Sequence, residues 1–407
     1  MRFPLPRAIL ARLRTAVTHP VGRASLLRVL SLVVGVLSSV ILARLGGAEV
    51  KGVASAFAAA NAVGFMLVNF DVPQQLLREI RAGADADVAW PTLVRAWAVY
   101  SAAGGVVLIV AFVTGAPLGW LIVGTLAFLI GSQAGVVSTG ISGIVVSAVG
   151  AIAQQLALVA ATVAFAAAGQ LNEDSVRIGV VFSYLAPMVI YVTYLVRNGG
   201  AGRGGRSRPV IRLARAGVPW QVGRFAQVLL QKADTLVLFS VSGAAAAGTY
   251  SVALSTAMLC TIVPAQFASK ALFDSTQRRV NDVGRATRAA LLTGGATAVV
   301  MALIGEPGIL LLYGDEFSAA YPALIACLVG AVAYGVIQVQ GTMIRMLGSW
   351  RDLAVTSGLG LATMLGALAL TVPSLGLVGA GISFSAGATC SALAGGVVLA
   401  RRGAQAE

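Results

Sequence analysis

Charged residues are scarce in this 407-residue sequence: they make up 11% of it, whereas hydrophobic residues make up 58%. Soluble domains carry about 25% charged residues, so this chain has too few charges to solvate its surface. The mean hydropathy of +0.88 agrees. These values exclude a water-soluble enzyme and predict an integral membrane protein built of apolar helices, each about 20 residues long.

Histidine and cysteine are nearly absent, with one and three residues respectively. His19 precedes the first apolar run, and Cys260, Cys327 and Cys390 lie far apart inside apolar stretches, without the paired spacing of a metal or redox motif. A His-based metal cluster or catalytic triad therefore cannot be assembled, and no metal site is predicted. The sequence also lacks a phosphate-cradling P-loop, so ATP hydrolysis is not expected.

Long apolar runs are abundant instead, and twelve of them are long enough to cross a membrane as helices. They cover residues 26–43, 53–70, 94–113, 118–138, 150–168, 177–196, 217–240, 246–268, 288–305, 322–344, 353–372 and 377–399. Residues 118–168 are almost continuously apolar, so a break is expected around residues 142–150. No catalytic residue is predicted, and we expect that the protein is not an enzyme.

The basic residues test this count independently, because cytoplasmic loops of membrane proteins are enriched in Lys and Arg. With the N-terminus in the cytoplasm, 24 of the 29 basic residues fall on that side, and Arg345 is one of them. The opposite side receives Arg44, Lys51 and Arg177, together with several acidic residues. The net charge of +14 therefore indicates an even number of spans with both termini cytoplasmic, and it is not evidence for nucleic-acid binding.

A basic, glycine-rich loop at the midpoint, "RNGGAGRGGRSRP", divides the chain into two sets of six spans. We predict an N-terminal six-helix bundle over residues 1–200, a cytoplasmic linker over residues 201–215 and a C-terminal six-helix bundle over residues 216–407. Because six is an even number, both bundles enter the membrane in the same orientation. A pseudo-two-fold axis along the membrane normal would then relate them.

The two halves also share a weak sequence repeat. The stretch "LARLGGAEVKGVASAFAAANA" aligns with "LFSVSGAAAAGTYSVALSTAM", which places Gly47 over Gly243 and Gly52 over Gly248. The repeat favours two copies in the same orientation, an arrangement that leaves a cavity between the two bundles.

Segment 217–240 combines a membrane span with ionisable side chains, which are costly in lipid and usually face a bundle interior or water. At about 100° per residue, its polar residues occupy one face, within an arc of about 160°. These residues are Gln221, Arg224, Gln227, Gln231, Lys232 and Asp234. Lys232 and Asp234 are two residues apart, and side chains at this spacing do not face each other on a helix. A direct ion pair between them is therefore not expected.

Several stretches of this chain occur in a recognisable order over roughly residues 25–400. They include "LARLGGAEVKGVASAFAAANAVGFMLVNF", "GVPWQVGRFAQVLLQKADTLVLFSVSGAAAAGTYSVA", "LLYGDEFSAAYPALIACL" and "SLGLVGAGISFSAGA". Together they resemble polysaccharide-export proteins related to O-antigen and lipid-linked oligosaccharide flippases. That family belongs to the multidrug, oligosaccharidyl-lipid and polysaccharide exporter superfamily.

The resemblance implies a MATE-like fold in which two bundles expose a central cavity to each side of the membrane in turn. It further implies a multi-pass protein of the bacterial inner membrane that flips a polyprenyl-diphosphate-linked oligosaccharide from the cytoplasmic to the outer leaflet. The expected partners are the lipid-linked glycan and membrane lipids, and not nucleic acid. Association with glycan assembly enzymes and coupling to protons or sodium are further options; no cofactor is expected.

Such a substrate predicts roles for the polar face of segment 217–240. Arg224 and Lys232 would bind phosphate oxygens, and Gln221, Gln227 and Gln231 would bind sugar hydroxyls. The alternative is that both cations extend to the headgroups and serve only as anchors.

Four further residues have open roles. Asp234 is a candidate for ion coupling or for structural packing against the next span. Arg28, Asn61 and Gln133 are candidates for substrate contact, although Arg28 would also serve as an interfacial anchor and the two amides as hydrogen bonds between helices.

Two alternatives to the flippase hypothesis stay open. A multidrug or cation-coupled exporter of the same superfamily predicts an acidic cavity, whereas the deep charges Arg224, Lys232 and Asp234 are net positive. A membrane glycan polymerase or transferase needs a catalytic base or nucleophile and usually a large extramembrane loop, and the loops predicted here are short.

Overall fold

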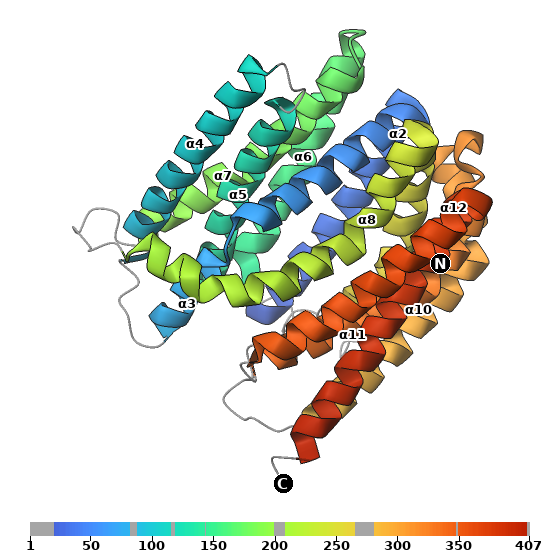
Figure 1. Ribbon diagram of the computed structural model, residues 1–407. Coiled ribbons are helices and arrows are strands. Elements are labelled where there is room, and N and C mark those ends of the chain that lie inside the picture. The colour runs from blue at the N-terminus through green and yellow to red at the C-terminus, as the bar shows by residue number, and fades with distance from the viewer. Residues whose placement is uncertain are drawn as a thin grey trace, which may run out of the picture. The chain divides into compact units, whose positions relative to one another are not determined.

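The computed structural model describes residues 20–81, 88–114, 119–142, 144–198, 208–264, 281–346 and 349–404, which are almost entirely helical (Figure 1). The α-helices are α2 (Pro20–Val68), α3 (Val72–Arg81), α4 (Ala89–Val113), α5 (Gly119–Ser142), α6 (Ile144–Ala167), α7 (Glu173–Asn198), α8 (Val210–Ala257), α10 (Asn281–Tyr313), α11 (Ala320–Met346) and α12 (Trp350–Ala404). Two short 3-10 helices are η2 (Met258–Thr261) and η3 (Asp315–Phe317). These ranges contain no strand, and the prediction of an all-α membrane protein is confirmed.

Nine helices in the described part of the chain are long and apolar enough to cross a membrane. Three of them, α2, α8 and α12, contain a glycine with positive φ: Gly47 (72°), Gly243 (85°) and Gly376 (52°). Glycine adopts this conformation without the Cβ penalty that other residues meet, so each long helix is two helices joined at a sharp break. Counting each broken helix as two gives twelve segments, in agreement with the predicted spans. The break expected around residues 142–150 falls between α5 and α6.

The described residues form two compact units, each with its own internal packing. The first unit consists of Met1–Ile41, Asp71–Ala168 and Ile178–Ala214, and the second of Leu42–Phe70, Gly169–Arg177 and Arg215–Glu407. The second half of α2 therefore packs with the helices of the C-terminal half. The two six-helix bundles remain a prediction, and residues 201–207 of the predicted linker lie outside the described residues.

Tyr191 of α7 ties three helices together in the first unit. Its side chain lies against Gly135 of α5 and Gly150 of α6, where any Cβ would overlap it. The Tyr191 hydroxyl donates to the Ser147 carbonyl at 3.4 Å, and the Tyr191 carbonyl accepts from the Ser138 hydroxyl at 3.5 Å. Small residues thus make room for one large side chain, as is common where membrane helices pack closely.

The beginning of α8 is anchored to α3 and α4 in the first unit. Glu79 of α3 pairs with Arg208 at 3.2 Å and with Arg212 at 2.7 Å. The Arg208 backbone N–H donates to the Thr92 hydroxyl at 2.9 Å. Partly exposed ion pairs contribute only about 0–1 kcal/mol each, so their main effect is to define where the chain enters α8.

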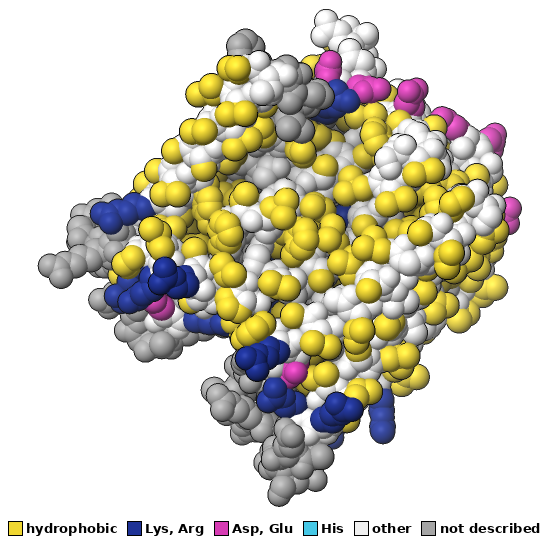
Figure 2. Space-filling view, in the orientation of Figure 1, with side chains coloured by type: hydrophobic (Ala, Val, Ile, Leu, Met, Phe, Trp, Pro, Cys, Tyr) yellow, Lys and Arg dark blue, Asp and Glu magenta, His cyan; other side chains and the backbone are white. Residues whose placement is uncertain are grey.

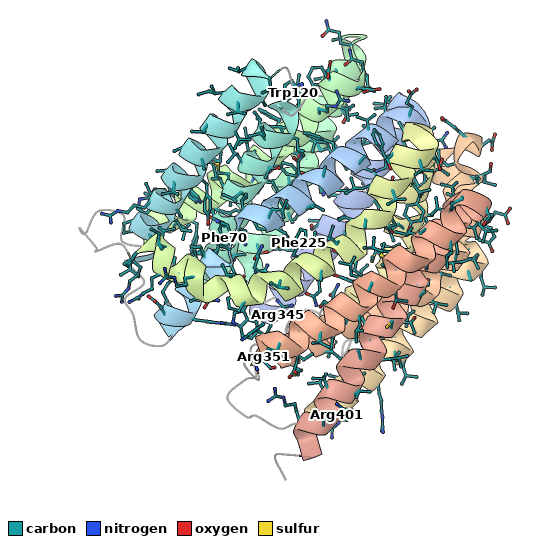
Figure 3. The ribbon with its side chains drawn as sticks, in the orientation of Figure 1. Phe70, Trp120, Phe225, Arg345, Arg351 and Arg401 are labelled. Carbon is teal, nitrogen blue, oxygen red and sulfur yellow. The ribbon has the colours of Figure 1, made fainter. Side chains whose placement is uncertain are left out.

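The second unit separates its charges by sign. Figure 2 shows a broad hydrophobic surface with basic side chains at one end and acidic side chains at the other. Arg345, Arg351 and Arg401 lie at the basic end (Figure 3). Many apolar side chains between the two ends are open to the surroundings, including Leu303 and Leu370 at 76% and 79% exposure. An apolar belt between charged ends suits a helical unit embedded in a lipid bilayer.

Candidate functional site

The first half of α8, before the break at Gly243, carries the predicted polar face. One side of this segment is packed inside the protein, through Trp220, Gly223, Ala226, Leu230 and Ala233. The polar residues border that packed side and are half-buried: Arg224, Gln227, Gln231 and Lys232. Two cations and two amides therefore lie together on one helix, and each of their side chains is only partly exposed.

Gln221 belongs to the same face but has a packing contact. It is buried, and its Nε2 donates to the backbone carbonyl of Met66 on α2. The Met66 sulfur also lies 3.8 Å from Nε2. This side chain joins α8 to α2 within the second unit, so its amide nitrogen is already engaged.

Gln227 meets α11 at a glycine. A Cβ on Gly341 would lie 3.1 Å from Gln227 Nε2 and 3.7 Å from Arg345 Nη2. Arg345 is half-buried, and its Nε donates to the Gly341 carbonyl at 3.1 Å. Sequence reasoning assigned Arg345 to the cytoplasmic charges and missed this contact. The missed signal is the spacing of Tyr334, Gln338, Gly341 and Arg345, which places them on one stripe of a helix.

Asp234 sits in a fully buried hydrogen-bond cluster. Its carboxylate accepts from the Tyr250 hydroxyl at 2.5 Å and from the Thr235 backbone N–H at 2.6 Å. The Cys327 sulfur of α11 lies 3.8 Å from the same Tyr250 hydroxyl. The cluster joins both halves of α8 to α11, which is the contact that a structural role for Asp234 requires. Tyr250 and Cys327 could not be assigned to it from spacing, because Tyr250 follows Asp234 by 16 residues across the break at Gly243 and Cys327 belongs to another helix.

The other candidate residues are not gathered at one place. Asn61 on α2 is fully buried within the second unit. Gln133 on α5 is fully buried within the first unit, where its side chain hydrogen-bonds the Tyr100 hydroxyl. The side chain of Arg28 lies outside the described residues. The residues brought together are therefore those of α8 and α11.

The sequence repeat is visible as a reciprocal contact between α2 and α8. A Cβ on Gly52 would overlap the Ala244 carbonyl oxygen, and a Cβ on Gly248 would overlap the Ala48 carbonyl oxygen. Each would also lie 2.9 Å from the backbone nitrogen of the opposite glycine. Two Ala-x-x-x-Gly segments thus cross backbone to backbone, in the manner of small-residue motifs in membranes. The alignment of Gly52 with Gly248 is confirmed by this equivalence.

Side chains from α2 and η3 cap helix ends near this crossing. The Glu316 Oε1 accepts from the Ala48 backbone N–H at 2.9 Å, directly after the break at Gly47. In return, Arg44 donates to the carbonyls of Leu311 and Leu312 at 2.7 and 2.9 Å. A carboxylate thus caps the start of one helix and a guanidinium caps the end of α10, both favourable to the helix dipoles.

Comparison with solved structures identifies the fold, although the sequence matches no family profile and no curated protein sequence. An inward-facing multidrug resistance MATE family transporter of the MOP superfamily has a TM-score of 0.66 at 13% identity, over 94% of this chain and 98% of its own. The lipid II flippase MurJ, in an inward closed conformation, has a TM-score of 0.68 at 11% identity, over 93% and 87%. The Vibrio cholerae MATE transporter VcmN has a TM-score of 0.55 at 13% identity, over 97% and 98%.

These similarities cover nearly the whole chain, so the fold is MATE-like, as predicted. The described residues contain nine membrane-length helices, so the chain is a multi-pass membrane protein of that fold.

Proposed function

We propose that this chain is a membrane transporter that flips an anionic, lipid-linked oligosaccharide from the cytoplasmic to the outer leaflet. The observation that carries the proposal is the half-buried face of α8 with Arg224, Lys232, Gln227 and Gln231. Cations inside a membrane span are costly unless they serve a ligand or face water. A polyprenyl diphosphate supplies the matching negative charge, and its sugar supplies hydroxyls for the amides. The similarity in fold to the flippase MurJ supports this choice.

Alternating access is the transport mechanism that we propose. The reciprocal crossing of Gly52 and Gly248 supports it, because equivalent residues from the two repeats meet at one point. The caps made by Arg44 and Glu316 lie beside this crossing, so they would separate and re-form with it. We place the protein in the bacterial inner membrane with both termini cytoplasmic, in association with glycan assembly enzymes.

A second candidate function, export of cationic drugs, is favoured by the similarity in fold to MATE transporters. A carboxylate would have to attract such a cation, and Asp234 is the one predicted deep in a span. Its oxygens bond to Tyr250 and Thr235 inside the packed second unit. We therefore favour a structural or ion-coupling role for Asp234, with protons or sodium as the coupling ion, and a glycolipid as the substrate.

Complementation tests the proposal. In a strain from which this protein is depleted, lipid-linked glycan should accumulate on the cytoplasmic face, and the wild-type chain should reverse this. Arg224→Ala and Lys232→Ala should each fail to restore transport while reaching the membrane in normal amounts. Arg177→Ala is the matched control, because Arg177 pairs locally with Glu173 and Asp174. Full transport by both α8 variants would refute the site, and ethidium efflux without any glycan phenotype would favour the drug exporter.

A further inference from the structure

The polar face of α8 has a counterpart on α11. Tyr334, Gln338, Gly341 and Arg345 recur every three or four residues, and at about 100° per residue they fall within an arc of about 60°. On α8, Arg224, Gln227 and Gln231 fall within a similar arc. The two stripes meet where Gln227 lies against Gly341. Both helices belong to the second unit, so this contact is made inside one compact body.

Gly341 lets two nitrogen donors reach the same place. Gln227 Nε2 and Arg345 Nη2 both lie within 4 Å of the position that a Cβ of residue 341 would occupy. A Cβ there would crowd Gln227 Nε2 and contact Arg345 Nη2 at van der Waals distance. The bond from Arg345 Nε to the Gly341 carbonyl holds the guanidinium one turn back along α11, beside Gln227.

The chemistry of these donors selects for an oxyanion. A guanidinium presents five N–H donors in a planar fork that matches phosphate, and a primary amide adds two more donors. The carboxylate of Asp352, at the start of α12, accepts from Arg402 Nε and Nη2 at 3.1 and 2.8 Å. That acidic group is therefore engaged by another arginine at the same end of the second unit.

We propose that Arg345 and Gln227, converging at Gly341, bind the diphosphate of the transported lipid, with Arg224 as the second cation of the site. The inference rests on the proposed function and deepens it, because it assigns the phosphate end of the substrate to the α8–α11 contact. The sugar then extends along α8 toward Gln231 and Lys232. Arg345 then binds substrate in addition to contributing to the positive charge of the cytoplasmic side.

Binding by the purified full-length protein in detergent tests the inference, with farnesyl diphosphate, inorganic pyrophosphate and phosphatidylglycerol as separate probes. Losing a charged hydrogen bond removes about 1.5–3 kcal/mol, which corresponds to roughly 10- to 100-fold in Kd. Arg345→Gln should weaken farnesyl diphosphate binding by that factor, and Arg345→Lys should recover part of it. Gly341→Ala should weaken it as well, because the methyl group would lie only 3.1 Å from Gln227 Nε2 and displace that donor.

Arg351→Gln is the matched control, since Arg351 lies at the same end of the unit and stacks on the Trp350 ring at 5.4 Å. Its binding should equal that of the wild type, and every variant should keep the wild-type elution profile and Tm. Equal loss in Arg345→Gln and Arg351→Gln would overturn the inference, as would displacement of the probe by phosphatidylglycerol at equal concentration.

The outcomes also separate this inference from the proposed function. Unchanged binding of farnesyl diphosphate by Arg345→Gln overturns the Arg345 site and leaves the flippase proposal standing. Arg345-dependent binding of pyrophosphate, without any binding of farnesyl diphosphate, supports an oxyanion site at Arg345 and speaks against a lipid-linked substrate.

Discussion

Replacing Gly52 by alanine adds one methyl group at the crossing of α2 and α8. The new Cβ would overlap the Ala244 carbonyl oxygen and lie 2.6 Å from the Ala244 carbonyl carbon. Because carbon atoms pack at about 3.5–4.0 Å, the two helices must separate by roughly 1 Å. The obstructing atoms are backbone, so no side chain can rotate away.

The expected effect is a net loss of stability. Overpacking of this kind costs about 1–3 kcal/mol, and the better helix propensity of alanine offsets at most about 1 kcal/mol. We therefore expect Gly52→Ala to destabilise this packing by about 1 kcal/mol, roughly a 5-fold shift in the equilibrium. Gly248→Ala should have the same effect, since its Cβ would meet the Ala48 carbonyl in the same way.

Thermal unfolding of the purified protein in detergent measures this loss of stability as a change in Tm. Gly295 of α10 is the control, because a Cβ there would meet nothing within 4 Å. Gly295→Ala should leave Tm unchanged or raise it, whereas Gly52→Ala and Gly248→Ala should each lower it by several degrees. The double variant should lose less than the sum of the two, because one separation relieves both overlaps. A Tm for Gly52→Ala that is equal to that of Gly295→Ala would refute the close backbone crossing.

Two further substitutions test the buried polar contacts. Tyr250→Phe removes the hydroxyl that donates to Asp234 and should cost about 1–3 kcal/mol, because a buried carboxylate loses a partner. Adding Asp234→Asn to this variant removes the unpaired charge and should raise Tm again. If Tm stays equally low in the double variant, this explanation is wrong. Glu316→Ala removes the acceptor for the Ala48 N–H and should cost about 0.5–2 kcal/mol, as loss of a helix cap does. The exposed Glu306 is the control, and equal Tm values for Glu306→Ala and Glu316→Ala would show that the cap contributes nothing.

Much of the fold could be predicted from the sequence because membrane insertion leaves a strong local signal. Apolar runs of sufficient length mark helices, and a glycine between two runs marks each break, as at Gly47, Gly243 and Gly376. The repeat was readable for the same reason: two backbones that touch require glycine at the contact. The compact units could not be predicted, since the packing of residues 42–70 with the C-terminal half depends on contacts far apart in the chain.

The candidate site was only partly predictable. Helical periodicity placed the polar residues of α8 on one face, but periodicity does not distinguish a face that lines a cavity from one that packs on another helix. Gln221 illustrates this limit, because its amide bonds the Met66 carbonyl. Arg345 illustrates a second limit. The positive-inside rule already accounted for its charge, so nothing in the sequence indicated that it lies beside Gln227.

The crossing of Gly52 and Gly248 has a consequence for how the two repeats can diverge. A side chain acquired by either copy would meet the main chain of the other, and no compensating change of side chain can remove a carbonyl group. The two positions are therefore restricted to the same residue by each other's backbone. Elsewhere the repeats are free to specialise, since one half carries Lys232 and Asp234 in its first span where the other has Val36 and Ser38. At this crossing both copies must keep glycine.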